Sequence, residues 1–396
     1  MFHVSFLAGT RLLIPGSALL IICACSDPSG PVTPGNSVLV TSGESHTLTV
    51  LDGLSGRIVS RISLAAGVDV AALSPDGATL YLSEDSSSPG DLVAIDTYSL
   101  QVRWREAQST STEPRYQRWG GVGVAAYYAL APSRDGSTLY AAPAFHADSL
   151  GSFSSGTLGV AAIGADDRDP VAHELGVLPR QFGLAPPPAT SALGQGELLL
   201  GGSRDINSFP QREWLYMLNP LTLTIDDSMG VVGEASDGSR YIVMPRYAPD
   251  GRDAYVMSAG ATAGLFKIDV ASRTVIHSAL VGLGGAFAIS PDGARLYQTH
   301  PSDAYGVPAS LLVYDSTLTL VRYIDLPTID GHPPALLDVA VSPDGSRVYA
   351  TAGTGSRVAL DGVTQSGILI AVDPTAGKVL WTTPLNVWLP RQVFVR

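Results

Sequence analysis

Ser290-Pro291-Asp292-Gly293-Ala294-Arg295-Leu296-Tyr297 decides the fold, because close copies of this stretch recur along the chain. The copies share a Ser-Pro-Asp-Gly turn or a near variant, a two-residue spacer, and a short strand with tyrosine at its second position. In the turn, Pro presets φ, Asp caps the backbone and Gly accepts positive φ at no steric cost. The other copies begin at Ser74, Ser133, Ala248 and Ser342. Such repeats predict an array of identical units, each a four-stranded blade.

A second marker gives the number of units. An apolar strand ends in Asp or Asn, and Val or Ile follows six residues later, which is typical of a hairpin whose Asp bonds the backbone just beyond it. The pairs are Asp52 with Ile58, Asp96 with Val102, Asn219 with Ile225, Asp269 with Val275, Asp315 with Val321 and Asp373 with Val379. Ala165 with Val171 is a degenerate copy, with the acidic cap moved to Asp166. Seven hairpins predict seven blades.

The two ends of the ring are predicted to meet in one blade. The first blade begins at Val38 without a preceding inner strand, and the segment Leu389–Arg396 matches Leu178–Ala185, which leads the fourth blade. We therefore expect the C-terminal strand to become the inner strand of blade one, which removes the exposed strand edges. The predicted fold class is all-β: a seven-bladed β-propeller of four-stranded antiparallel blades, closed by the C-terminal strand.

The N-terminus reads as a targeting segment. Arg11 precedes an apolar run from Leu12 to Ile22 that is too short to span a bilayer, and Ile22-Cys23-Ala24-Cys25 resembles the lipobox of bacterial lipoproteins. The resemblance implies a signal peptide at 1–24, lipid attachment at Cys25, and a tether over 25–37 leading to the propeller at 38–396. An ordinary secretory signal is the alternative. Ser26 favours the outer membrane or cell surface within the cell envelope.

Charge and cysteine content exclude several classes of function. The net charge of −12 argues against nucleic acid as a partner and against a basic membrane-docking face, so membrane attachment would come from the lipid anchor. The only two cysteines lie in the N-terminal segment, which excludes disulfides, cysteine nucleophiles and thiolate metal sites from the expected mature protein. No metal site and no cofactor are predicted, and a monomer is the default expectation.

The repeat phrase, the Asp-capped hairpins and the seven-unit count together resemble YVTN-type β-propeller repeat proteins, a broad group of exported bacterial proteins. The resemblance covers nearly all of 38–396 and is specific for the fold. It does not imply one function, because the group includes binding and surface proteins while related rings serve as lactonases and amine dehydrogenase subunits.

Insertions gather on one predicted face of the ring, which we call the long-loop face. They fall at 108–123, 143–156, 203–212, 300–309, 327–335 and 353–366, in connections between blades or between second and third strands. Function concentrates on such loops. Among them, Arg115, Arg118 and Trp119 are candidates for binding an anionic or sugar-like ligand. Alternatively, Trp119 packs against the barrel while both arginines remain solvated.

Charged residues near the starts of inner strands form a second candidate group. Arg180 and Arg391 open matching strands, Asp69 occupies the equivalent place in another blade, and Arg246 is a weaker relative. They are predicted to ring the channel mouth as ligand-binding residues, with structural salt bridges as an equal alternative. Four histidines, at positions 46, 146, 300 and 332, also fall in loops of the long-loop face, but scattered surface positions explain them better than a metal or acid–base site.

The sequence favours a lipid-anchored cell-envelope propeller that acts as a binding or scaffold module through its long-loop face. The expected ligand is a protein, a peptide or a saccharide. The alternative is an enzyme, a lactonase-like hydrolase or lyase with an axial His/Arg site, and the sequence leans away from it because no catalytic signature is present.

Overall fold

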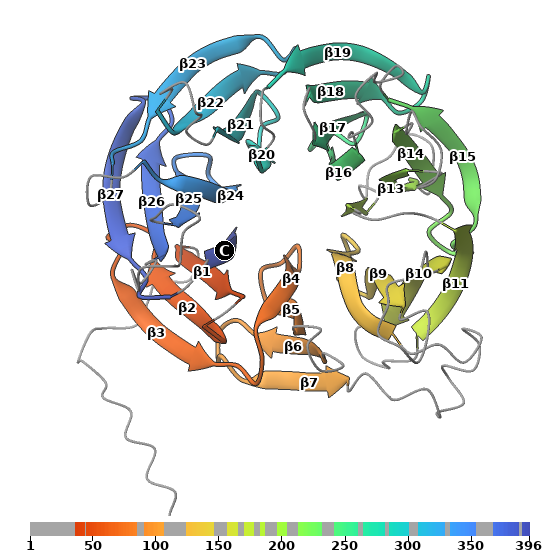
Figure 1. The fold of residues 1–396 in the computed structure, drawn as a ribbon, viewed down its shortest axis with the longest axis horizontal. Coiled ribbons are helices and arrows are strands. Elements are labelled where there is room, and N and C mark those ends of the chain that lie inside the picture. The colour runs from red at the N-terminus through yellow and green to blue at the C-terminus, as the bar shows by residue number, and fades with distance from the viewer. Residues whose placement is uncertain are drawn as a thin grey trace, which may run out of the picture. The chain divides into compact units, whose positions relative to one another are not determined.

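The structure is a computed structural model, and it describes residues 36–43, 45–84, 91–106, 124–145, 157–164, 170–177, 183–186, 196–203, 213–231, 241–259, 264–281, 285–300, 308–328, 333–353, 367–387 and 390–396. These residues form seven four-stranded antiparallel sheets arranged as blades around a centre (Figure 1). The predicted all-β, seven-bladed architecture is confirmed. None of the described segments is a helix that could cross a membrane.

Each blade runs from an inner strand at the centre to an outer strand at the rim (Figure 1). Blades 1 to 3 are built from β28 (Pro390–Val395), β1 (Ser37–Ser42), β2 (Thr47–Asp52) and β3 (Ile58–Ser63); β4 (Val68–Leu73), β5 (Thr79–Glu84), β6 (Leu92–Asp96) and β7 (Val102–Glu106); and β8 (Val124–Pro132), β9 (Thr138–Phe145), β10 (Thr157–Gly164) and β11 (Pro170–Val177).

Blades 4 and 5 are built from β12 (Leu184–Ala185), β13 (Leu198–Ser203), β14 (Glu213–Leu218) and β15 (Ile225–Gly230), and from β16 (Tyr241–Tyr247), β17 (Asp253–Ala259), β18 (Gly264–Asp269) and β19 (Thr274–Leu280). Blades 6 and 7 are built from β20 (Phe287–Ile289), β21 (Arg295–His300), β22 (Ser310–Asp315) and β23 (Leu320–Asp325), and from β24 (Ala335–Val341), β25 (Val348–Gly353), β26 (Gly367–Asp373) and β27 (Lys378–Pro384).

The Ser-Pro-Asp-Gly turns have the geometry that the sequence predicts. In blade 7, the Ser342 hydroxyl donates to Asp344 Oδ1 at 2.6 Å, and the Ser346 backbone N–H donates to the same oxygen at 3.0 Å. Gly345 has a φ of 71°, a left-handed conformation that glycine adopts without steric cost. These bonds hold the turn closed, so the strands on either side leave it in antiparallel register.

The Asp or Asn hairpins between third and fourth strands are confirmed in six blades, and the degenerate seventh, at Ala165, lies outside the described residues. In blade 7, Asp373 Oδ1 accepts hydrogen bonds from the backbone N–H groups of Thr375 and Ala376, both at 2.8 Å. Because these short connections and the Ser-Pro-Asp-Gly turns join alternate pairs of strands, they lie on one face of the ring. We call this the tight-turn face, and it is opposite the long-loop face.

The hydrophobic core lies between neighbouring blades. Apolar side chains of adjacent sheets interdigitate in a series of clusters, one of which spans blades 5 and 6 and includes Tyr255, Leu296 and the fully buried Phe287. Burial of this kind supplies most of the free energy that holds sheets face to face. The inner strands are thereby fixed relative to one another, and they form a rigid frame around the centre.

The C-terminal strand closes the ring as predicted. β28 pairs with β1 in antiparallel register, with Phe394 opposite Leu39. Beyond the last rung, the Ser37 backbone N–H donates to the Arg396 carbonyl at 3.2 Å, and the Arg396 N–H donates to the Ser37 carbonyl at 3.0 Å. Blade 1 is therefore made from both ends of the propeller segment.

Candidate functional site in the axial channel

A β-bulge recurs at one position in five of the seven inner strands. At this position one residue is left without a partner on the neighbouring second strand, and β8 has a second such residue at Ala125. In four of them this residue stands five positions before the first residue of the Ser-Pro-Asp-Gly or related turn. The bulged residues are Asp69, Tyr128, Val243, Leu337 and Arg391. Bulges re-aim side chains and are common beside functional sites, so this ring of bulges marks the channel end nearer the long-loop face.

Two sequence-predicted candidates, Asp69 and Arg391, meet at this ring. Arg391 Nη1 lies 3.0 Å from Asp69 Oδ1, and their side chains are 25% (Asp69) and 42% (Arg391) exposed. The pair connects the inner strand of blade 1 to that of blade 2. An ion pair with this exposure contributes little to stability, on the order of 0–1 kcal/mol. The predicted equivalence of the two positions is visible in the fold, while ligand binding by them stays a prediction.

The residue after the bulge reaches toward the next blade. Asp338 of β24 does so most clearly: its Oδ2 accepts the backbone N–H of Val393 in β28 at 2.9 Å. Gln392, one residue past the bulge of β28, points its amide nitrogen toward the Ala71 carbonyl of blade 2, 3.4 Å away. These side chains bond polar groups on the free inner edge of the neighbouring strand.

Asp338 is an unusual carboxyl for this position. Burial raises its pKa to about 6, and the Val393 N–H and the positive charge of Arg246 offset only part of that effect. A carboxyl in this state titrates close to neutral pH, which is typical of groups at functional sites.

Arg246 faces the same channel from blade 5. Its guanidinium carbon lies 5.7 Å from the ring centroid of Phe287, on the inner strand of blade 6, in a cation–π arrangement. Arg246 is exposed, and desolvation by the protein around its guanidinium lowers its pKa below the usual arginine value. Among the described residues it forms no salt bridge, although its charge interacts with Asp338.

A buried amide lies beside Phe287. Gln298 of β21 stands opposite Phe287 in the sheet, so both side chains face the core between blades 5 and 6. Gln298 is fully buried, and neither its oxygen nor its nitrogen has a hydrogen-bond partner among the described residues. Nδ1 of His300, two residues along the same face, is also buried and unpartnered. The equivalent residues of blades 2, 3, 5 and 7 are Leu82, Ala141, Val256 and Ala350.

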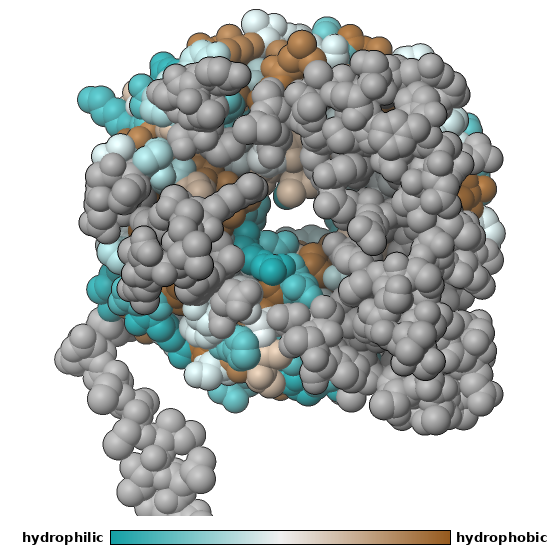
Figure 2. All heavy atoms as spheres, viewed as in Figure 1, coloured by the Kyte–Doolittle hydropathy of each residue, from teal (hydrophilic) through white to brown (hydrophobic). Residues whose placement is uncertain are grey.

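The channel is open at its centre. Figure 2 shows a central opening through the ring, with hydrophilic side chains among those on its rim. The described channel therefore combines an ion pair, a carboxyl with a raised pKa and a guanidinium held over an aromatic ring. Such groups can bind a polar ligand that carries charges of both signs.

Several predicted residues lie outside the described residues: Cys25, Arg115, Arg118, Trp119 and Arg180, together with His146 and His332. His300 was expected in a loop, but it is the last residue of strand β21. Sequence reasoning missed Asp338 and Gln298, which lie within otherwise ordinary strands. Aligning the repeats would have singled out Gln298, because its equivalents are apolar. No cluster of metal-ligating side chains occurs among the described residues.

Comparisons with known proteins support the fold alone. No family model and no curated protein matches the chain. Among solved structures, it is similar to the dihydro-heme d1 dehydrogenase NirN in complex with DHE, with 16% identity, a TM-score of 0.53, and coverage of 93% of this chain and 77% of that one. A protein of unknown function from Desulfotomaculum acetoxidans has 13% identity, a TM-score of 0.60, and coverage of 91% and 98%. Hydrazine synthase of Kuenenia stuttgartiensis has 14% identity, a TM-score of 0.53, and coverage of 89% and 94%.

Proposed function

We propose that this protein is a lipid-anchored binding module of the bacterial cell envelope, and that it holds its ligand at the axial channel. The observation that carries the proposal is the arrangement of Asp338 and Arg246. These opposite charges face one channel from blades 7 and 5 and influence each other, yet no salt bridge joins them. Asp338 is half-buried, and a carboxylate in such a place is costly to ionise without a cationic partner, so a site built only for stability would bring the two charges together.

The chemistry of the channel favours a peptide as the ligand. Arg246 offers N–H donors for a carboxylate, and Asp338 offers an ionisable carboxyl for an ammonium group. A peptide end or a short peptide with free termini carries both groups. Phe287, beneath the guanidinium, limits the conformations of Arg246 and so reduces the entropy lost on binding.

Calorimetric titration of the propeller with trialanine tests the proposal. We expect binding that is weakened about tenfold or more by blocking both termini of the peptide. Arg246→Gln and Asp338→Asn should each cause a similar loss. The matched control is Arg273→Gln on the outer rim, where the ion pair with Glu197 lies away from the channel. If the blocked peptide binds as well as the free one, the assignment of the channel is wrong.

The raised pKa of Asp338 also favours a test of the enzymatic alternative, because a carboxyl that titrates near neutral pH can serve as a general base. A screen of lactone hydrolysis, with metal analysis of the same sample, addresses it. We expect no turnover above that of the Asp338→Asn variant. Turnover that disappears in this variant would replace the binding proposal with a hydrolase.

The lipid anchor is tested separately. Cys25→Ser removes the sulfur to which the lipid would be attached. We expect this variant to leave the membrane fraction, whereas Cys23→Ser should remain there. Equal membrane content in both variants would contradict the anchor without affecting the assignment of the channel.

A further inference from the structure

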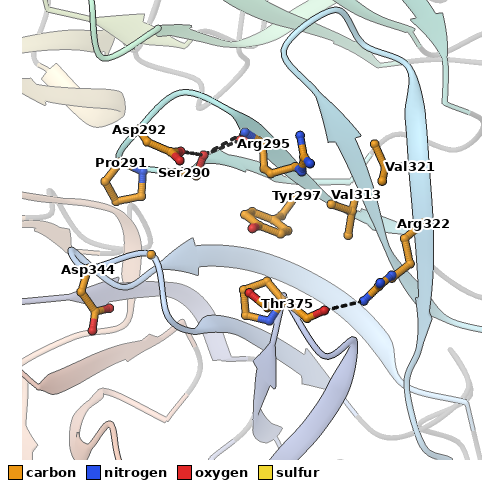
Figure 3. A pocket seen from close by; sticks show the side chains of 12 residues that line it. Ser290, Pro291, Asp292, Arg295, Tyr297, Val313, Val321, Arg322, Asp344 and Thr375 are labelled. Atoms are coloured by element: carbon orange, nitrogen blue, oxygen red, sulfur yellow. Dashed lines mark hydrogen bonds between the residues drawn. The ribbon is translucent and has the colours of Figure 1, made fainter.

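A second pocket lies between blades 6 and 7, away from the axial channel (Figure 3). We call it the blade 6–7 pocket. Its volume of about 420 Å³ falls within the range of roughly 300–1,000 Å³ that is typical of small-molecule sites. It is lined by Arg295, Tyr297 and Arg322 from blade 6 and by Asp344 and Thr375 from blade 7. Ser-Pro-Asp-Gly and Asp-hairpin residues contribute to it, so it opens on the tight-turn face.

The pocket occupies a place where a hydrogen bond joins two other pairs of blades, 5 to 6 and 7 to 1. In blades 5 and 7, the tyrosine that follows the Ser-Pro-Asp-Gly turn or its variant donates its hydroxyl to the next blade, at the carbonyl just after the hairpin aspartate. Tyr255 of blade 5 donates to the Ser316 carbonyl of blade 6 at 3.1 Å. Tyr349 of blade 7 donates to the Gly53 carbonyl of blade 1 at 3.0 Å. This bond closes the space between two blades at the tight-turn face.

Blade 6 lacks this bond, as does blade 3, where no hydrogen bond to the Tyr140 hydroxyl is found among the described residues. By the same relation, the Tyr297 hydroxyl would donate to the carbonyl of Pro374, but among the described residues no hydrogen bond to the Tyr297 hydroxyl is found. The ring of Tyr297 instead lines the pocket (Figure 3), and Pro374 is another of its lining residues. The hydroxyl is therefore available to a ligand, and filling the pocket would restore a contact between the blades.

Two arginines supply positive charge to the pocket. Arg322 Nη1 donates to the Thr375 carbonyl at 2.9 Å, and Arg295 Nη1 donates to the carbonyl of its neighbour Ala294 at 3.0 Å. Neither forms a salt bridge among the described residues. Arg103 of blade 2, which is equivalent to Arg322 of blade 6, behaves differently. Its Nη2 lies 2.6 Å from Oδ2 of the hairpin aspartate of its own blade, Asp96. Arg295 and Arg322 thus keep most of their N–H donors for another group.

The same pocket offers ionised acceptors. A serine hydroxyl bond lowers the pKa of both turn aspartates that line it, and the pKa of Asp344 falls to about 2. Asp292 Oδ1 accepts from the Ser290 hydroxyl and the Ala294 N–H, and no bond to Oδ2 occurs within the described part of the chain. Apolar side chains, including Val313 and Pro291, complete the lining.

We infer that the blade 6–7 pocket binds a sugar that carries a carboxylate. The two arginines match the carboxylate, whose planar geometry suits guanidinium forks. The aspartates and the Tyr297 hydroxyl match ring hydroxyls, which both donate and accept. The apolar side chains that line the pocket can contact the C–H face of the sugar ring. This inference does not depend on the function proposed for the axial channel, because the pocket shares no residue with it.

Titration with methyl glucuronide, followed by ligand-observed NMR and calorimetry, tests the inference. We expect the wild-type protein to bind this probe about tenfold or more tightly than methyl glucoside or acetate. Tyr297→Phe and Arg322→Gln should each weaken binding about fivefold or more. Equal binding of acetate would mean an adventitious anion site, and equal binding of the glucoside would remove the role of the arginines. Either result overturns the inference.

The repeats provide a matched control. Tyr297→Phe loses no hydrogen bond within the described residues, so it should leave the melting temperature unchanged while it weakens binding. Tyr349→Phe loses the bond to Gly53, so it should lower the melting temperature while glucuronide binding persists. The reverse pattern would show that Tyr297 is structural and that the pocket is not its site of action. Arg246→Gln should not affect glucuronide binding, which separates this pocket from the channel.

Discussion

At the scale of single residues, two polar groups lower the stability of the fold, one at the channel and one in the core between blades 5 and 6. Asp338 is a carboxyl whose burial opposes its charge, and Gln298 is an amide with no hydrogen-bond partner in the part of the chain that the structure describes. Both residues lie in inner or second strands that packing holds rigid. The structure therefore cannot relax locally around them, and each lowers the free energy of unfolding of the whole ring. Residues of this kind persist where they serve binding, and both can be tested through stability as well as function.

Asp338→Asn should stabilise the protein above pH 6. The folded-state pKa of Asp338 is raised from 3.8 to about 6, so its stabilising contribution is fully present below pH 3.8 and is lost as the pH rises through 6. Asparagine keeps an oxygen that accepts the Val393 N–H but does not ionise. We expect the variant to melt roughly 2–6 °C higher than the wild type at pH 7.5, with a smaller difference at pH 4.5. Equal differences at both pH values would contradict the raised pKa.

Gln298→Leu should also stabilise the protein, because leucine is what blade 2 carries at the equivalent position, Leu82. Removing a buried amide that has no partner is worth roughly 1–3 kcal/mol. Chemical denaturation at neutral pH measures the change. Leu82→Gln is the matched control and should destabilise by a similar amount. A loss of stability in Gln298→Leu would mean that Gln298 is satisfied by ordered water.

At the scale of elements, β28 is the strand on which the ring depends. It pairs with β1, its Val393 N–H is held by Asp338 of blade 7, and its Arg391 is held by Asp69 of blade 2. One strand thus connects three blades. The apolar side chains of β28 are also part of the core between blades 7 and 1, where Val393 is buried.

Deleting residues 389–396 should open the ring and destabilise it sharply. The deletion exposes the edge of β1 and removes core packing between blades 7 and 1. We expect the melting temperature to fall by more than about 10 °C, with a tendency to aggregate. The control is Arg391→Ala, which removes the exposed ion pair but leaves the strand and should change stability by less than about 1 kcal/mol. A deletion variant that melts like the wild type would refute closure by β28.

Much of this element could be predicted from the sequence, because the repeats are periodic. The likeness of 389–396 to 178–185 placed β28 in blade 1, and Phe394 does lie opposite Leu39. The bulges at Asp69 and Arg391 could not be predicted, since a bulge depends on how an inner strand bends toward its neighbours. Asp338 escaped notice for a related reason: a single sequence does not tell which side chain of an inner strand faces the channel and which faces the next blade.

At the scale of the whole molecule, the ring is closed within blade 1 and not at a boundary between blades. The closure is the pairing of β28 with β1, which we call the seam. Ser37 and Arg396 are bonded to each other through both of their backbone groups. The covalent chain therefore crosses every junction between blades, including the junction between blades 7 and 1, where the connection runs from β27 to β28. Separating the blades requires breaking either the chain or the ladder between β28 and β1.

A circular permutant tests the value of this seam. Joining Arg396 to Ser37 through an Asn-Gly turn and opening the chain between Val387 and Pro390 makes every blade contiguous, because the two-residue turn suits adjacent antiparallel strands. We expect the permutant to fold with the same blades but to unfold at lower denaturant concentration, since only side-chain packing then joins blades 7 and 1. Equal or greater stability would show that the seam adds nothing beyond packing.

The antiparallel arrangement of β28 and β1 has a mechanical consequence. A pulling force applied at Asn36 and Arg396 acts on the same end of the two strands, so their rungs would rupture one after another, as in a zipper, instead of sharing the load. A propeller pulled at these two points should unfold at low force, beginning with blade 1. Pulling on any other blade should require a higher force, because the ring is then still closed.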